Sequence, residues 1–347
     1  MLRNSLLGLS LLGLAVLAPT CAPVADPDTD TLTIGAYSVA REALHDGLLP
    51  AFAARWEGQH PGRHLRFEES YNGSGAQTRS IASGFDADVA VLSLEDDVEQ
   101  LVKAGVVNVG WNSGPARGMV TRSLVVIAHR PGNPKGIADW RDLTRPGVAV
   151  LYPDPKTSGG ARWNINAIYG AGLLSRQPDD PQEARGLLAA VQANVVNMDS
   201  SGRQSMATFG RGTGDAVVTY ENEILLQSKM NGQAVPYVIP PATLLIEGPA
   251  AVVDASVDRH GNRALAEAFL AFMRSPEGQA ILVDYGFRPL DPMLDADTGR
   301  APFPPKLFTM KDVGGWTKAK EEIYAPGGVW DSIFTRKAGA KPGGAGR

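Results

Sequence analysis

The chain has 347 residues, of which 44% are hydrophobic, and its formal net charge is −4. A hydrophobic core of that size usually divides, so the length favours two domains over one. No block of basic residues stands in the interior of the chain, which argues against a nucleic-acid-binding protein.

The first 21 residues are typical of an export signal. One early arginine precedes an apolar run from Leu6 to Ala18, which is too short for a stable membrane span. Cys21 is the only cysteine and stands just after this run, where a lipoprotein signal would be cleaved and the cysteine lipidated. The alternative is an ordinary signal peptide (1–21) with an incidental cysteine. Residues 22–30 are polar and rich in proline, so we expect a linker there.

Beyond the linker, short apolar segments alternate with segments of helical periodicity. The predicted strands are 31–38, 64–70, 87–93, 123–132, 147–155, 194–200 and the start of 215–229, and 234–254 is extended. The predicted helices are 40–58, 75–84, 94–105, segments from Gly159 and from near Gly202, the end of 215–229, and two pieces of 262–286 broken at Ser275–Pro276. Strands that alternate with helices predict an α/β fold with mostly parallel sheets.

The order of these elements also suggests how the chain is divided. The last helices have no strands after them, so they must pack on a sheet built from earlier residues. The simplest arrangement has two α/β lobes, with the chain crossing between them near 117–123 and 244–250. The expected boundaries are 31–116 and 250–334 for lobe one, 117–249 for lobe two and 335–347 for a flexible, basic tail.

Three predicted strand-to-helix turns share a serine, a glycine and a following arginine. They are Ser74-Gly75 with Arg79, Ser158-Gly159-Gly160 with Arg162, and Ser201-Gly202 with Arg203. The first N–H groups of a helix lack internal partners and carry partial positive charge, so such a turn suits an anion. Plain helix capping is the alternative for any one turn. Three of them at the edge where α/β sheets bind ligands favour a shared oxyanion site.

Catalytic motifs are absent from the sequence around these turns. The chain has no G-x-S-x-G elbow and no phosphate-binding P-loop, and its five histidines show no metal-ligand spacing. An exported sulfatase or phosphatase would need a metal cluster or an activated nucleophile, so we disfavour an enzyme. We expect neither a cofactor nor a metal site.

The three turns and several further stretches resemble the periplasmic sulfate-binding proteins of ABC importers. The most specific stretch is PKTSGGARWN at 155–164. Four further stretches match in order along the chain: ADVAVLSLEDDVEQLVKAG (87–105), FGRGTGDAVVTYENEILL (209–226), AEAFLAFMRSPEGQAILVDYGFRP (266–289) and KLFTMKDVGGW (306–316). The resemblance covers about 31–334 and implies a type II periplasmic binding protein. In that fold two lobes, each a mixed sheet flanked by helices and joined by a two-segment hinge, close over one dehydrated sulfate.

The resemblance also implies which residues contact the anion. The expected contacts are Ser38, Ser74, Ser158, Gly159, Gly160, Gly202 and Tyr220. Ser158 would donate from both its hydroxyl and its N–H. Ser74 and the glycines would donate from their N–H groups. Two positions depart from the family. Tyr37-Ser38-Val39 stands where the first loop of the family usually reads Tyr-Asp-Pro. Tyr220 replaces a tryptophan whose indole N–H contacts the anion in that family. Arg162 and Arg203 would lie behind the anion-binding loops, where their positive charge would act on the side of each loop that faces away from the anion. The alternative is that both arginines face solvent.

These implications define the expected function. The protein would be a periplasmic, monomeric receptor that delivers sulfate to an inner-membrane ABC permease, with no nucleic acid as a partner. A tyrosine hydroxyl both donates and accepts, so thiosulfate, molybdate and phosphate-type anions stay open as ligands. An anion sensor on the same fold that has lost uptake is a further alternative.

Overall fold

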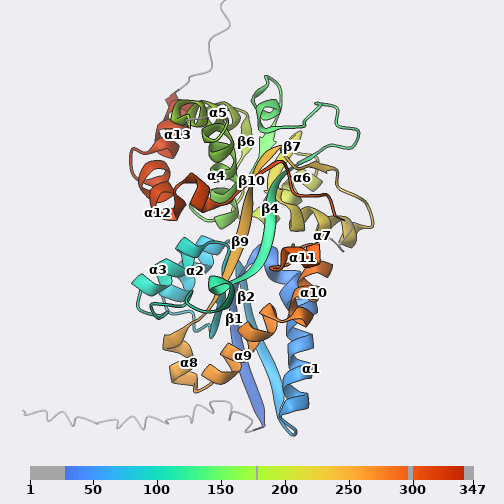
Figure 1. The fold of residues 1–347 in the computed structure, drawn as a ribbon, viewed down its shortest axis with the longest axis vertical. Helices are drawn as coiled ribbons and strands as arrows, with labels where there is room; N and C mark the ends of the chain where they lie inside the picture. Colours follow the sequence, from blue (N-terminus) through green and yellow to red (C-terminus); the bar gives the residue numbers. More distant parts are fainter. Residues whose placement is uncertain (1–27, 177–178, 296–299, 340–347) are drawn as a thin grey trace, which may run out of the picture.

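One continuous sheet runs through the molecule and carries helices on its faces (Figure 1). The computed structural model describes residues 28–176, 179–295 and 300–339. The strands are β1 (Thr29–Tyr37), β2 (His64–Asn72), β3 (Val89–Val91), β4 (Met119–His129), β5 (Val150–Leu151), β6 (Val195–Asn197), β7 (Ala216–Tyr220), β8 (Tyr237–Val238), β9 (Ala242–Val252) and β10 (Lys306–Phe308).

Helices occupy most of the remaining chain. The α-helices are α1 (Leu49–Gln59), α2 (Ser74–Ala82), α3 (Glu95–Lys103), α4 (Gly159–Leu173), α5 (Pro181–Ala193), α6 (Gly202–Gly210), α7 (Glu221–Asn231), α8 (Asp254–His260), α9 (Arg263–Arg274), α10 (Pro276–Asp284), α11 (Pro292–Asp295), α12 (Gly315–Ala319) and α13 (Val329–Gly339). Short 3-10 turns lie at Ser38–Ala40, Pro115–Gly118, Trp140–Thr144 and Met310–Val313, and π-helical turns at Ala43–Leu48 and Lys320–Tyr324.

The sheet consists of two parallel groups joined by two long antiparallel strands. Its strand order is β2-β1-β3-β9-β4-β7-β5-β6, and β8 and β10 pair with β4 and β9 outside that path. β1 is parallel to β2 and β3, and β5 is parallel to β6 and β7. The predicted α/β architecture with mixed sheets flanked by helices is confirmed.

β4 and β9 connect the two groups. β4 pairs with β9 over Met119–Leu124 and with β7 over Val125–His129. β9 in turn pairs with β3 near its end and with β10 at its start. Figure 1 shows both strands running along the molecule between two sets of helices. Ten of the eleven β4 residues are buried, as suits a strand that is covered on both faces.

The last described segment lies beside the middle of the chain. β10 pairs with Ala242–Leu244 of β9, α13 packs against α5, and Trp316 meets Trp163 of α4 edge-on at 4.9 Å between ring centroids. Figure 1 shows α12 and α13 next to α4 and α5. The division into lobes stays a prediction, and these contacts favour grouping residues 306–334 with lobe two rather than with lobe one.

The ends of the described chain differ slightly from expectation. β1 begins at Thr29, inside the expected linker, and α13 continues to Gly339, into the expected tail. The expected signal peptide with Cys21 and residues 340–347 lie outside the described residues. Among the helices that are described, none has the length and apolar character needed to cross a membrane.

Candidate anion-binding site

A small buried cavity lies where the starts of α2, α4 and α6 approach one another. Its volume is about 10 Å³, roughly the room that one water molecule needs. The residues that line it are Tyr37, Ser38, Val39, Gly73, Ser74, Ser93, Pro153, Ser158, Gly160, Asn164, Gly202, Thr219 and Tyr220. All of the anion contacts expected from the sequence except Gly159 are among them. Their role as contacts stays a prediction, but the fold does bring them together.

The three helix starts at this cavity differ in how they are capped. Ser201 caps α6, because its side chain accepts a hydrogen bond from the Gln204 N–H. Gly73 and Ser158 precede α2 and α4 and make no such bond. The capping alternative therefore holds for one of the three serine–glycine turns only. The first turns of α2 and α4 keep N–H groups that no side chain caps, with the positive end of each helix dipole at the cavity wall.

Ser74 and Ser158 each have one donor that the protein itself uses. The Ser74 hydroxyl donates to Asp97 Oδ2 at 2.5 Å and accepts from the Ser93 N–H at 2.9 Å. The Ser74 N–H makes no hydrogen bond among the described residues and is therefore its available donor. The Ser158 N–H, expected to contact the anion, donates to the Asp154 carbonyl at 2.9 Å. The Ser158 hydroxyl is the group of this residue that stays available to a ligand.

Gly159 does not line the cavity, although it is the first residue of α4. A Cβ at this position would lie 2.7 Å from Ser93 Oγ and 2.9 Å from Ser93 Cβ. Glycine is therefore required here by the close packing of α4 on the turn after β3. This packing explains the residue type without an anion, so a direct contact from Gly159 stays a prediction.

Ser93 and Tyr220 form a buried hydroxyl pair at the cavity. The two oxygens lie 2.6 Å apart, and either residue can be the donor. Burial raises the pKa of the Tyr220 hydroxyl well above its ordinary value, so this group stays protonated and uncharged. Ser93 was not among the predicted contacts, although it ends the predicted strand 87–93 and lies within the stretch 87–105 that resembles the family.

Asn164 is a second lining residue that the sequence analysis missed. Its Nδ2 donates to the Val218 carbonyl at 2.8 Å, and its Oδ1 has no hydrogen-bond partner among the described residues. The side chain is 1% exposed. It closes the motif PKTSGGARWN, and that position was the only available signal. The cavity wall thus contains one uncommitted acceptor beside its donors.

Arg162 and Arg203 do not line the cavity and are paired elsewhere. Arg162 Nη1 lies 3.0 Å from Asp96 Oδ2, and Lys320 Nζ lies 3.2 Å from the other oxygen of Asp96. Arg203 lies between two carboxylates, 2.5 Å from Glu42 and 2.6 Å from the buried Glu223. Both arginines therefore neutralise neighbouring carboxylates. No ionised side chain lines the cavity, so an anion there would be held by neutral donors and helix dipoles.

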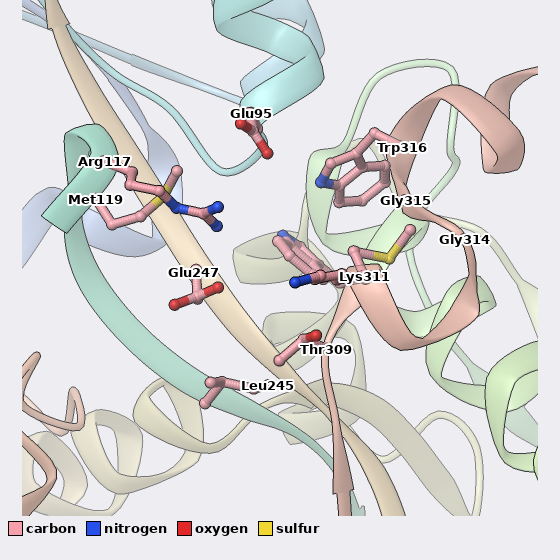
Figure 2. Close-up of a pocket in the computed structure, with 12 residues that line it drawn as sticks. Glu95, Arg117, Met119, Leu245, Glu247, Thr309, Lys311, Gly314, Gly315 and Trp316 are labelled. Carbon is pink, nitrogen blue, oxygen red and sulfur yellow. The ribbon is translucent and has the colours of Figure 1, made fainter. Parts of the chain in front are cut away.

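A larger pocket of about 500 Å³ lies on another part of the surface. Figure 2 shows the carboxylates of Glu95 and Glu247, the Arg117 guanidinium and the Lys311 amine around it. Charges of both signs would oppose a dianion as much as attract one, so this pocket is a poor oxyanion site. No group of three or more metal-ligating side chains occurs in the described ranges.

Comparison with known proteins agrees with the geometry. The family model for bacterial extracellular solute-binding proteins matches residues 41–288. A sulfate-binding protein from Synechococcus elongatus is 40% identical over 89% of this chain and 87% of its own. A thiosulfate-binding protein from Pseudomonas aeruginosa is 32% identical over 86% of this chain and 90% of its own. The solved sulfate-binding protein SubI from Mycobacterium tuberculosis superposes with a TM-score of 0.76, at 35% identity over 84% of this chain and 98% of its own.

Proposed function

Since the chain belongs to the bacterial extracellular solute-binding proteins, which supply ABC importers, we propose that it captures sulfate in the buried cavity and delivers it to an inner-membrane permease. The observation that carries this proposal is the composition of the cavity wall. Free donors from the starts of α2 and α4 and from the Ser158 hydroxyl meet there without an ionised side chain. Sulfate carries no proton at neutral pH, so it needs donors only.

Binding would depend on closure of the two predicted lobes. Ser38 and Ser74 belong to lobe one, whereas Ser158, Gly160 and Gly202 belong to lobe two. An anion that contacts both sets favours the closed state, because only closure lets it use all donors at once. The ligand is buried in that state and has to be released at the permease by reopening.

Isothermal titration calorimetry of the purified protein with sodium sulfate tests the proposal. We expect one saturable site with a dissociation constant below about 1 mM. Absence of saturable binding would refute the proposed function. A chromogenic assay with aryl sulfate and aryl phosphate serves as the enzymatic comparison, and turnover there would favour the sulfatase or phosphatase alternative.

Ser158→Ala tests the site itself. Loss of one hydrogen bond to a charged ligand costs about 1.5–3 kcal/mol, so we expect sulfate affinity to fall about 10- to 100-fold. Ser201→Ala is the matched control, because Ser201 also precedes a helix and a glycine but does not line the cavity. It should lower stability by about 1 kcal/mol through the lost cap and leave affinity nearly unchanged. Unchanged affinity in Ser158→Ala would remove this residue from the site.

A related oxyanion is the second candidate ligand. The uncommitted Asn164 Oδ1 and the Tyr220 hydroxyl both can accept a hydrogen bond, which a protonated anion requires. Titration with inorganic phosphate and with thiosulfate under the same conditions ranks these ligands against sulfate. Phosphate affinity equal to or above that for sulfate would replace sulfate as the proposed ligand.

A further inference from the structure

Two hydroxyl groups from distant parts of the chain meet at the cavity. Ser93 lies two residues after β3, and Tyr220 is the last residue of β7. Their oxygens are 2.6 Å apart, and the side chains are 1% and 3% exposed. Both residues line the cavity. The hydrogen-bond donors and acceptors that this pair presents to a ligand therefore depend on both residues together.

The remaining hydrogen bonds of Ser93 involve its backbone only. Its N–H donates to Ser74 Oγ at 2.9 Å, and its carbonyl accepts from Trp163 Nε1 at 2.8 Å. These bonds fix the position of the residue between α2 and α4 without using its hydroxyl. In the part of the chain that the structure describes, each hydroxyl of the pair bonds only to the other.

A count of protons shows what the pair can supply. Each hydroxyl has one proton and two lone pairs. The bond between them uses one proton, whichever residue donates, and leaves the second proton unspent. When Ser93 donates, the Tyr220 proton is free, and when Tyr220 donates, the Ser93 proton is free. Because both residues line the cavity, one hydroxyl donor remains there in either arrangement.

We infer that Ser93 and Tyr220 act as one exchangeable donor to the bound oxyanion. The inference deepens the proposed function and rests on it, since it requires an anion in this cavity. Rotation about the two C–O bonds exchanges the two arrangements, and the spare proton is then on Tyr220 or on Ser93, so the donor position shifts without any backbone movement. Such a donor suits tetrahedral dianions of more than one size, and sulfate is the ligand used to test it.

A double-mutant cycle measured with sodium sulfate tests this exchange. Ser93→Ala leaves the Tyr220 proton, and Tyr220→Phe leaves the Ser93 proton, so each single variant should bind with a dissociation constant within about threefold of the unchanged protein. The double variant loses the last hydroxyl proton, and its dissociation constant should rise about 10- to 100-fold. The loss in the double variant therefore exceeds the product of the two single losses.

The outcomes separate this inference from the proposed function. A full loss in one single variant, with no further loss in the double variant, would overturn the exchange and assign the donor to one residue. Equal affinity in all four proteins would also overturn it while leaving sulfate binding intact. If the unchanged protein does not bind sulfate, the proposed function and the inference fail together.

Two further variants control for structural damage. Tyr152→Phe removes another buried phenol hydroxyl, which bonds to Gln192 and does not line the cavity, so sulfate affinity should stay unchanged. Ser93→Cys keeps the shape of the side chain with a somewhat larger atom in place of the oxygen, and its thiol is only a weak donor. It completes the same cycle with Tyr220→Phe if thermal unfolding shows that the alanine variant does not fold.

Discussion

The polar groups around the cavity divide into those that the protein has already bonded and those that stay free. The Ser74 hydroxyl and the Ser158 N–H are bonded to Asp97 and to the Asp154 carbonyl. Among the described residues, the free donors are the Ser158 hydroxyl, one proton of the pair formed by Ser93 and Tyr220, and the N–H groups at the starts of α2 and α4. Asn164 Oδ1 is a free acceptor. A ligand therefore meets neutral donors, and its selection depends on which of its own oxygens carry a proton.

Asp97 should make sulfate binding depend on pH. It is fully buried, and burial raises the pKa of its carboxyl to about 6, against the lowering effects of Arg162 and of the Ser74 hydrogen bond. Arg79 lowers this pKa further and Asp96 raises it. An ionised Asp97 repels a dianion beside Ser74, so sulfate should bind better when Asp97 is protonated. We expect affinity to fall as pH rises from about 5 to about 7.

Calorimetric titration at several pH values checks this expectation, with Asp97→Asn as the comparison. The amide cannot ionise, so its affinity should stay flat over the same range. A similar slope in both proteins would exclude Asp97 as the cause. The free energy of unfolding should also depend on Asp97, because the pKa of its carboxyl is about 6 in the folded state and 3.8, the ordinary value, in the unfolded chain. The folded state then binds more protons between these values, and the free energy of unfolding falls as pH rises through them.

Single residues of the site differed in how well the sequence revealed them. Ser158 and Gly160 stand in a contiguous motif whose meaning is local, because a helix start needs only neighbours in sequence. Ser93 acquires its role from Tyr220, 127 positions away, and that pairing exists only after the sheet has formed. Asn164 was visible in the motif, but its free acceptor depends on the Val218 carbonyl taking its amide donor.

Gly160 and Gly202 lie at two helix starts beside the cavity, but the space around them differs. Substituting each by alanine therefore gives a matched pair of variants. A Cβ at Gly160 would lie 3.2 Å from Ser158 Oγ and 3.5 Å from the Tyr220 ring, and both of these residues line the cavity. At Gly202 the nearest atom is Val39 Cγ2 at 3.5 Å, which is an ordinary contact. We expect Gly160→Ala to weaken sulfate binding at least about tenfold, since the methyl group displaces a ligand oxygen. Gly202→Ala should bind as the unchanged protein does.

Helix propensity separates this effect from general damage. Alanine favours a helix over glycine by about 1 kcal/mol, so neither variant should unfold at a lower temperature without ligand. Calorimetry gives the affinities and thermal unfolding gives the stabilities. Equal loss of affinity in both variants would mean that the two glycines are equivalent, which contradicts the geometry.

Most helices and strands followed from periodicity, and the exceptions have identifiable causes. The expected strand 147–155 is reduced to Val150–Leu151, because Pro153 and Pro155 lack the N–H groups that a longer pairing needs. α5 went unpredicted although Asp180 caps it and Pro181 occupies its first turn, a signal that was present in the sequence. The expected helix 40–58 begins with a π-turn over Ala43–Leu48, where Gly47 packs closely on Ile281 and Tyr285.

For the whole molecule, element order predicted the architecture but not the position of the C-terminal segment. β4 and β9 connect the two parallel groups in the region where crossings were expected. Residues 306–334 instead pack beside α4 and α5, through β10 and the contact of Trp316 with Trp163. Nothing local in the sequence distinguishes the two parallel groups of strands on which late helices can pack, because each group offers an apolar face.

The start of α2 also touches the other predicted lobe, and this contact gives a test of closure. Arg79 Nη1 donates to the Lys156 carbonyl at 3.1 Å, and the Ala76 N–H approaches the Thr157 carbonyl at 3.4 Å. A Cβ at Gly73 would lie 2.6 Å from the Thr157 oxygen and 3.0 Å from the Ser200 oxygen. Both are backbone atoms of lobe two, so they can retreat only if the lobes separate.

Gly73→Ala should therefore hold the lobes apart without damaging either one. The backbone of Gly73 has φ −58°, which alanine also adopts, so stability without ligand should be unchanged. We expect sulfate affinity to fall at least about tenfold, because the donors of the two lobes no longer converge. In small-angle X-ray scattering, saturating sulfate should shrink the radius of gyration of the unchanged protein but not that of Gly73→Ala.

Gly75→Ala is the control, since the atom nearest to its Cβ would lie at 3.6 Å and both closure and affinity should persist. Closure of Gly73→Ala to the same radius would show that this contact does not limit the bound state.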